Sequence, residues 1–225
     1  MKLAWQQIPS TVISELLCNV GLDGVVLDTE HGFFNNETLY NCIQLITSIG
    51  KICFVRLTEP SKTMTRACLD AGANGIIFSM TETEEQCEVI HEICKFPSQG
   101  GRRGLGLVRQ NKWGIENITT DKPIIIAQIE TIRGIENLKE ISSYGFDYYM
   151  IGPYDLSASL GDAANFESQD YLSAIEKVKS LIPNNKMAVH IPKDVKNQLQ
   201  KYQDYGIIAV GMDTTGLLEF YKEMA

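Results

Sequence analysis

The chain has 225 residues, of which 44% are hydrophobic, and a formal net charge of −8. This is enough apolar material for one substantial core, and the acidity argues against a nucleic-acid partner. The opening residues MKLAWQQIPS lack the apolar centre of a signal peptide, and no apolar run is long enough to cross a bilayer. We therefore expect a cytoplasmic protein without a membrane or nucleic-acid partner.

Short apolar runs alternate with amphipathic stretches along the whole chain. The predicted strands are residues 3–7, 24–30, 52–57, 75–79, 124–130, 147–152, 186–191 and 207–213. Amphipathic helices are predicted between them, for example over 10–21, 35–50 and 168–182. Several helices are expected to end at a glycine just before the next strand, namely Gly21, Gly50, Gly72, Gly145 and Gly206.

Most predicted strands are near-continuous apolar runs, as expected for strands covered on both faces. Eight such strands with intervening helices predict a single (β/α)₈ TIM-barrel domain over residues 1–225. The rival is an open doubly wound sheet. No glycine fingerprint follows the first strand, and the glycine-rich stretch at 100–106 follows a helix, which disfavours that rival.

Two other features bear on the fold. The six cysteines show no CxxC spacing and mostly occupy apolar positions, so we expect buried, reduced thiols. The segment from Phe96 to Pro123 is long and irregular, which indicates a functional loop or a contact with another subunit. Together with residues 32–36 it is expected to influence substrate specificity.

Two carboxylates, Glu130 and Asp155, follow strands that are about one strand–helix–strand unit apart. Both acids should therefore lie at the same end of neighbouring parallel strands. Oxygen ligands without a neighbouring His or Cys suit a hard divalent ion such as Mg²⁺ or Mn²⁺, and Co²⁺ is also compatible. The spacing thus predicts a metal site with positions left for water and substrate.

Chemistry in a TIM barrel gathers at the carboxyl ends of the strands. The other polar residues predicted there are Asp28, Glu30, His31, Arg56, Ser79, Gln128, His190 and Asp213. The strand lysines Lys51 and Lys186 begin their strands, at the opposite end. A Schiff-base mechanism needs a lysine in the pocket, so metal-dependent chemistry is favoured.

Five of these candidates also have a structural interpretation. Glu130 could stabilise the start of the helix near Thr131, and Asp155 could be a helix N-cap. Arg56 could pair with a core acid, Gln128 could fill the barrel interior, and His31 could be an ordinary loop histidine.

Four further residues stay open at this point. His91 is expected to be a solvated helix residue, and His190 either lines the pocket or makes a structural hydrogen bond. Arg102 and Arg103 are most simply explained as solvated loop residues, with a role in binding a substrate carboxylate as the alternative.

Six segments together resemble the HpcH/HpaI aldolase family. They are LDTEHG (27–32), FVRL (54–57), LDAGANGII (69–77), GGRRGLG (100–106), AQIET (127–131) and IGPYDLSASLG (151–161). The resemblance runs from about Ile8 to Leu218. Phe33 and Ser79 depart from the family, which often has proline at these positions.

The resemblance implies roles for particular residues. Glu130 and Asp155 match the metal-binding carboxylates, and His31 matches a catalytic base that forms a His–Asp dyad with Asp28. Arg56 matches the arginine that holds pyruvate and its enolate. The substrate-binding positions also include Gln128 and the backbone N–H groups of Tyr154 and Asp155.

The resemblance also implies an activity: metal-dependent cleavage of a 4-hydroxy-2-oxo acid, of the 4-hydroxy-2-oxo-heptanedioate or 2-keto-3-deoxy sugar acid type, to pyruvate and an aldehyde. It implies a homo-oligomer, a hexamer or a dimer, in which the last helix is exchanged between subunits. Two alternatives remain: a malyl- or citryl-CoA-type lyase, and a catalytically silent barrel that acts as a binding subunit.

Overall fold

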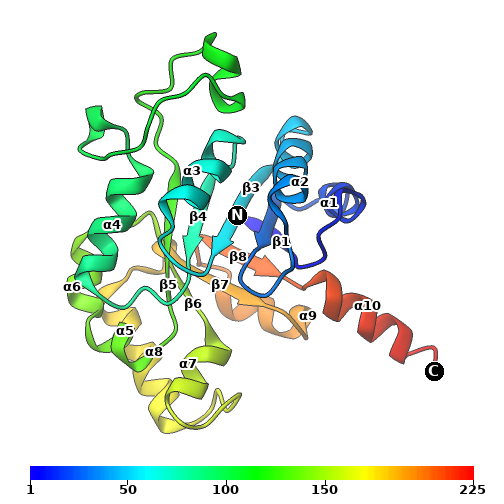
Figure 1. Ribbon diagram of the computed structural model, residues 1–225. Helices are drawn as coiled ribbons and strands as arrows, with labels where there is room; N and C mark the ends of the chain where they lie inside the picture. Colours follow the sequence, from blue (N-terminus) through cyan, green and yellow to red (C-terminus); the bar gives the residue numbers. More distant parts are fainter.

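The computed structural model describes residues 1–225 as a closed barrel of eight parallel strands, paired in sequence order from β1 to β8 and back to β1 (Figure 1). The predicted (β/α)₈ fold is therefore confirmed. The strands are β1 (Lys2–Gln6), β2 (Gly24–Asp28), β3 (Ile52–Leu57), β4 (Gly75–Phe78), β5 (Ile124–Ile129), β6 (Tyr148–Ile151), β7 (Met187–Ile191) and β8 (Ile207–Val210).

Helices cover the outside of the barrel. They are α1 (Thr11–Cys18), α2 (Asn36–Ser48), α3 (Lys62–Asp70), α4 (Glu84–Cys94), α5 (Ile132–Glu136), α6 (Leu138–Ser143), α7 (Pro153–Ser159), α8 (Gln169–Leu181), α9 (Val195–Gln198) and α10 (Asp213–Lys222). None of them is long and apolar enough to span a membrane. All six cysteines are buried and unpaired, in agreement with the sequence prediction.

The alternation of side chains along each strand creates two apolar clusters. The larger cluster lies between the strands and the helices. The smaller one fills the barrel interior and contains Trp5, Val26, Phe54, Ile126 and Ala188. The next inward-facing positions lie two residues further along each strand, towards its carboxyl end. These positions form the floor of the functional site.

Four of the five predicted glycine C-caps have the left-handed backbone that this role requires. Their φ angles are +81° at Gly21, +82° at Gly50, +101° at Gly72 and +68° at Gly145. Gly206 does not have a positive φ. A Cβ atom there would collide with the carbonyl of Asn185, so this glycine serves close packing and the C-cap prediction for it is wrong.

The irregular segment 96–123 connects the end of α4 to the start of β5, and so belongs to the amino-terminal end of the barrel. In Figure 1 it is the green loop at the top, far from the α7 end. It holds two short 3₁₀ turns, Pro97–Gln99 and Arg109–Gly114. The Arg109 guanidinium anchors it by donating to Thr47 and to the Ala71 carbonyl.

Candidate active site

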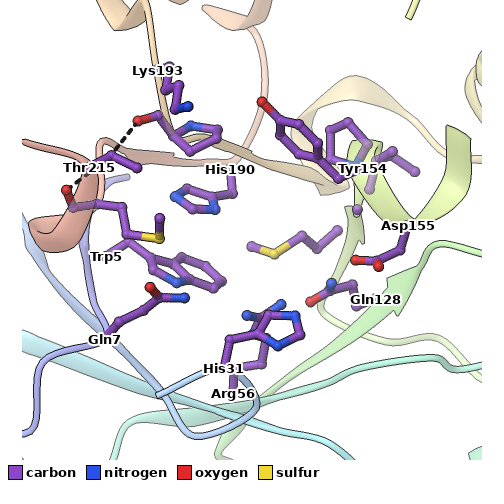
Figure 2. Close-up of a pocket in the computed structure, with 16 residues that line it drawn as sticks. Trp5, Gln7, His31, Arg56, Gln128, Tyr154, Asp155, His190, Lys193 and Thr215 are labelled. Atoms are coloured by element: carbon purple, nitrogen blue, oxygen red, sulfur yellow. Dashed lines mark hydrogen bonds between the residues drawn. The ribbon is translucent and has the colours of Figure 1, made fainter. Parts of the chain in front are cut away.

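A cavity of about 360 Å³ opens at the carboxyl ends of the strands (Figure 2). Four strands place a polar side chain two residues beyond an interior apolar residue: Asp28, Arg56, Gln128 and His190. The last three of these line the cavity. Inward alternation thus converts the apolar barrel interior into a polar layer at one end.

Arg56 and Asp28 form a buried bidentate pair. The guanidinium Nε donates to Asp28 Oδ1 at 2.9 Å and Nη2 donates to Oδ2 at 2.7 Å. The third guanidinium nitrogen, Nη1, is 2.8 Å from Glu30 Oε2, which also accepts from the Ser79 hydroxyl at 2.7 Å. The structural pairing of Arg56 with a core acid is therefore real. Because a guanidinium has five N–H bonds, two remain for a ligand.

Asp28 is surrounded by donors. Trp5 Nε1 and Gln7 Nε2 each donate to its Oδ2 at 3.1 Å, in addition to the bonds from Arg56. Burial raises the pKa of Asp28, but the hydrogen bonds and charge of Arg56, with Gln7 and Trp5, outweigh burial and lower it to about 2. Asp28 is therefore a fixed negative charge that holds Arg56 in place.

His31 lies in the loop after β2, and its ring lines the cavity near Arg56 (Figure 2). The predicted dyad with Asp28 has a different geometry here. Asp28 Oδ1 accepts from the backbone N–H of Glu30 at 3.1 Å and of His31 at 3.3 Å, while the carboxylate is occupied by Arg56. Asp28 thus shapes the loop that carries His31 and makes no hydrogen bond to the imidazole.

Glu130 is 2% exposed and directly follows β5. Its Oε1 accepts from the backbone N–H of Met80 at 2.7 Å, and its Oε2 accepts from Gln128 Nε2. Burial raises the pKa of Glu130 to about 7, with the charges of Glu30 and Asp155 adding to the rise. Met80 has a positive φ of 47°, so a strained turn after β4 directs its amide at this carboxylate.

The helix-capping interpretations of the two predicted metal ligands are wrong. Thr131, not Glu130, caps α5 by accepting from Gly134 N–H at 3.0 Å. The N-cap of α7 is Gly152, and Asp155 lies in the first turn without a capping hydrogen bond. Neither carboxylate therefore caps a helix.

Gly152 allows Glu130 to pack closely against the start of α7. A Cβ atom at this position would meet the Glu130 carboxylate and would lie 3.1 Å from Gln128 Nε2. Asp155 projects from the next turn into the cavity, beside the Gln128 amide (Figure 2). The absence of a side chain at Gly152 thus leaves room for the Glu130 carboxylate, which lies behind the cavity wall, whereas Asp155 and Gln128 line the cavity.

The donor chemistry here fits a divalent cation. Glu130 and Asp155 supply carboxylate oxygens, and Gln128 Oε1 is a buried acceptor without a hydrogen-bond partner in the protein. Hard ions such as Mg²⁺ and Mn²⁺ prefer such oxygen donors. No cluster of three or more His, Cys, Asp or Glu side chains is arranged to hold an ion alone. The site suits an ion that shares its ligands with water or substrate.

Several cavity residues were not predicted from the sequence. Trp5 lies inside β1, Lys193 and Met212 lie in the loops after β7 and β8, and Thr215 lies in the first turn of α10. Because side chains alternate along a strand, the position of Trp5 in β1 could have shown that it faces the barrel interior. The same alternation says nothing about residues that lie beyond the strands. The Lys193 side chain is exposed at the cavity mouth, on the side away from Gln128 and Asp155 (Figure 2).

His190 both lines the cavity and makes a structural hydrogen bond, so both of its open interpretations hold. Its Nε2 is 2.9 Å from the Gly211 carbonyl, and its ring stacks on Trp5 with centroids 4.1 Å apart. Burial lowers the pKa of His190 to about 4. The ring is therefore neutral near pH 7.

Other candidates are structural. Arg103 is buried, not solvated as expected: it pairs with Asp70 at 2.9 Å and covers the Phe96 ring. Arg102 pairs with Glu92 at the surface. His91 is half-buried against the Tyr144 and Phe146 rings, which corrects the prediction of a solvated residue.

Asp213 fastens the end of β1 to α10. Its carboxylate accepts from the backbone N–H groups of Gln7 and Ile8 at 2.9 and 2.8 Å. It is therefore a connector beside the cavity and does not line it.

Known proteins resemble this chain over nearly its full length. The sequence model of the HpcH/HpaI aldolase/citrate lyase family matches residues 5–219. A 2-keto-3-deoxy-L-rhamnonate aldolase of Klebsiella pneumoniae is 29% identical over 93% of this chain and 82% of its own. A hydroxypyruvate/pyruvate aldolase of Roseobacter denitrificans is 29% identical over 98% of this chain and 90% of its own.

A solved structure shows the same fold. A HpcH/HpaI aldolase/citrate lyase family protein from Burkholderia cenocepacia superposes with a TM-score of 0.89 and 23% identity. The match covers 100% of this chain and 92% of that one.

Proposed function

Since the chain belongs to the HpcH/HpaI aldolase/citrate lyase family, we propose that it is a lyase that cleaves a 4-hydroxy-2-oxo acid to pyruvate and an aldehyde, with a divalent metal ion as cofactor. The named relatives are aldolases, which break carbon–carbon bonds. The observation that carries the proposal is a pair of carboxylates at neighbouring strand ends: buried Glu130, packed against Gly152 directly after β5, and Asp155, which lines the cavity from the first turn of α7.

Glu130 and Asp155 would hold the cation, and Gln128 would orient the neighbouring ligand. When bound, a divalent cation supplies Lewis-acid polarisation of the 2-oxo group. Oxygen donation does not distinguish Mg²⁺, Mn²⁺ and Co²⁺. The backbone N–H groups of Tyr154 and Asp155, in the first turn of α7, would donate to the pyruvate carboxylate because the first turn of a helix leaves its amides unpaired.

Arg56 and His31 would share the charge and proton movements. As the C3–C4 bond breaks, its electron pair moves towards C3 and negative charge develops on the 2-oxo oxygen. The two spare N–H bonds of Arg56 would stabilise that oxygen from a position fixed by Asp28. His31 would accept the proton of the 4-hydroxyl, directly or through water, and the aldehyde carbonyl forms. The enolate would then take a proton at C3, from water or from the His31 imidazolium, to give the pyruvate methyl group.

Metal-dependent exchange of deuterium into the methyl group of pyruvate tests the proposal directly. We expect exchange and aldol cleavage to require Mg²⁺, Mn²⁺ or Co²⁺ and to disappear in Glu130→Gln and Asp155→Asn. The Asp23→Asn variant, in which an exposed surface carboxylate is changed, should retain both activities. Full activity after chelation, or turnover of malyl-CoA without cleavage of hydroxy-oxo acids, would contradict the proposal. Absence of exchange with every ion would favour a silent binding subunit.

We further propose that the chain acts as a homo-oligomer, a hexamer or a dimer. Helix α10 has no buried residue and projects from the barrel in Figure 1. It exposes Leu217, Leu218, Phe220 and Tyr221, and α1 exposes Val12 and Leu16. Exposed apolar surface of this extent is typical of a protein interface.

A further inference from the structure

The cavity has two chemically different sides. Gln128 and Asp155 lie on one side, and Trp5 and Thr215 lie on the other, with His190 above Trp5 (Figure 2). If the pyruvate half of the substrate lies beside the carboxylates, as the proposed function requires, the aldehyde half faces β7, β8 and β1. The residues of this second side should therefore determine which aldehyde is used.

His190 has a fixed orientation and a defined tautomer. A backbone carbonyl can only accept, so the 2.9 Å contact with Gly211 makes Nε2 the N–H donor. The ring lies parallel to the Trp5 indole, with an interplanar angle of 11°. In a neutral imidazole whose Nε2 carries the proton, Nδ1 is left with a lone pair and can only accept.

That lone pair has no donor in the protein. The only hydrogen bond of the His190 ring is the one to Gly211. Nδ1 is not fully buried, and the ring lines the cavity, so a ligand there can reach this atom. The apolar residues Pro192 and Met212, which follow β7 and β8, line the cavity on this side. An acceptor in such surroundings gains most from a donor that the ligand brings.

We propose that His190 Nδ1 accepts a hydrogen bond from a hydroxyl group on the aldehyde half, so that the enzyme prefers hydroxyaldehydes to unsubstituted aldehydes. This inference rests on the proposed function. Lys193 offers a competing feature, a positive charge that would favour a carboxylated aldehyde. Because Lys193 is exposed at the cavity mouth, water and salt weaken its attraction. The hydroxyl is therefore the group that the site distinguishes.

Two variants separate the roles of the two ring nitrogens. His190→Gln places an amide near Nε2, so it can keep a donor for Gly211 but removes the acceptor at Nδ1. His190→Asn places an amide near Nδ1, so it can restore that acceptor but loses the bond to Gly211. The measurement is kcat/KM for addition of pyruvate to glycolaldehyde divided by that for acetaldehyde, two aldehydes that differ by one hydroxyl.

We expect the ratio to fall about 10-fold in His190→Gln, the effect of one neutral hydrogen bond, and to stay within about 3-fold of wild type in His190→Asn. Lys193→Met is the matched control and should leave the ratio unchanged. An unchanged ratio in His190→Gln, or a loss in His190→Asn only, would overturn the inference, as would a wild-type preference for succinic semialdehyde that Lys193→Met abolishes.

Deuterium exchange into pyruvate separates this inference from the proposed function. Wild type and both His190 variants should exchange at similar rates, because that reaction needs no aldehyde. Normal exchange together with an unchanged aldehyde ratio in His190→Gln would refute the role of His190 and leave the proposed function standing. Absence of exchange in the wild type refutes the proposed function, and the inference falls with it.

Discussion

At the scale of single residues, Arg56 shows how one side chain can be structural and functional together. Three of its nitrogens are held by Asp28 and Glu30, and the guanidinium carbon lies 4.9 Å from the centroid of Trp5. A cation confined in this way keeps its position when substrate charge changes. Confinement therefore serves catalysis, because no reorganisation is needed as charge develops.

Asp28→Asn should lower stability and weaken pyruvate binding together. Removing one charge of a buried bidentate pair leaves Arg56 only partly compensated, which costs about 3 kcal/mol in unfolding free energy. Urea denaturation measures this loss. Asp23→Asn changes an exposed carboxylate that accepts one backbone N–H, and should cost less than about 1 kcal/mol. Equal losses of unfolding free energy in the two variants would show that the buried Asp28–Arg56 pair contributes no more stability than the exposed hydrogen bond of Asp23.

The same carboxylate predicts a pH dependence of stability. The pKa of Asp28 is about 2 in the folded protein and 3.8 ordinarily. Its contribution is therefore complete above about pH 4 and is lost as the pH falls towards 2, because the unfolded chain takes up the proton first. As the pH falls from about 4 to about 2, the unfolding free energy of wild type should decrease more steeply than that of Asp28→Asn. Parallel curves would mean that another group causes the acid sensitivity.

His31 provides a further test at this scale. His31→Ala should reduce cleavage by about 10²–10⁴-fold, the usual contribution of a general base. Metal binding, followed by calorimetry, should persist because the carboxylates are untouched. His91→Ala changes a histidine remote from the cavity and should leave catalysis intact. Loss of metal binding in His31→Ala would instead make His31 part of the cation site.

At the scale of elements, the junction of β6 with α7 controls the carboxylate pair. In Gly152→Ala, the new methyl carbon would lie 2.8 Å from Glu130 Cβ and would press on its carboxylate. We expect cleavage to fall by about 10²-fold, the typical effect of misplacing a catalytic group by about an ångström. Gly216→Ala in α10 meets no atom within 4 Å and serves as the control. Full activity in Gly152→Ala would show that Glu130 tolerates displacement.

The sequence predicted the strands well because their apolar runs and glycine caps are local signals. All eight were found, and β3 has the same bounds in both descriptions. The ends were extended too far at β2, where Thr29 and Glu30 already belong to a loop, and at β8, where Asp213 already begins α10. Which residues share a cavity was less predictable. Arg103 and Arg102 are adjacent in sequence, yet one is buried beside Phe96 and the other is exposed. Only the packed fold decides that difference.

At the scale of the whole molecule, the two ends of the barrel have different roles. The segment 96–123 emerges at the amino-terminal end, so the expectation that it shapes this chain's own pocket is wrong: none of its residues line the cavity. It exposes Leu105, Leu107, Trp113 and Ile115 instead. The alternative expectation, a contact with another subunit, fits these exposed apolar side chains better.

Helix α10 gives the test of assembly. Leu218 and Phe220 are 51% and 56% exposed, and the helix has no buried residue within its own chain. If α10 packs on a neighbouring subunit, Leu218→Glu with Phe220→Glu should place two charges in an apolar interface and reduce the mass measured by light scattering to that of a monomer. Val89→Glu changes a 42%-exposed residue on α4 and should leave the mass unchanged. Asp213, at the start of α10, is hydrogen-bonded to the end of β1 beside the cavity. If packing of α10 on a neighbouring subunit helps to hold this cavity rim, the double variant should also lose activity. A wild-type protein that is already monomeric at every concentration would refute the proposed oligomer.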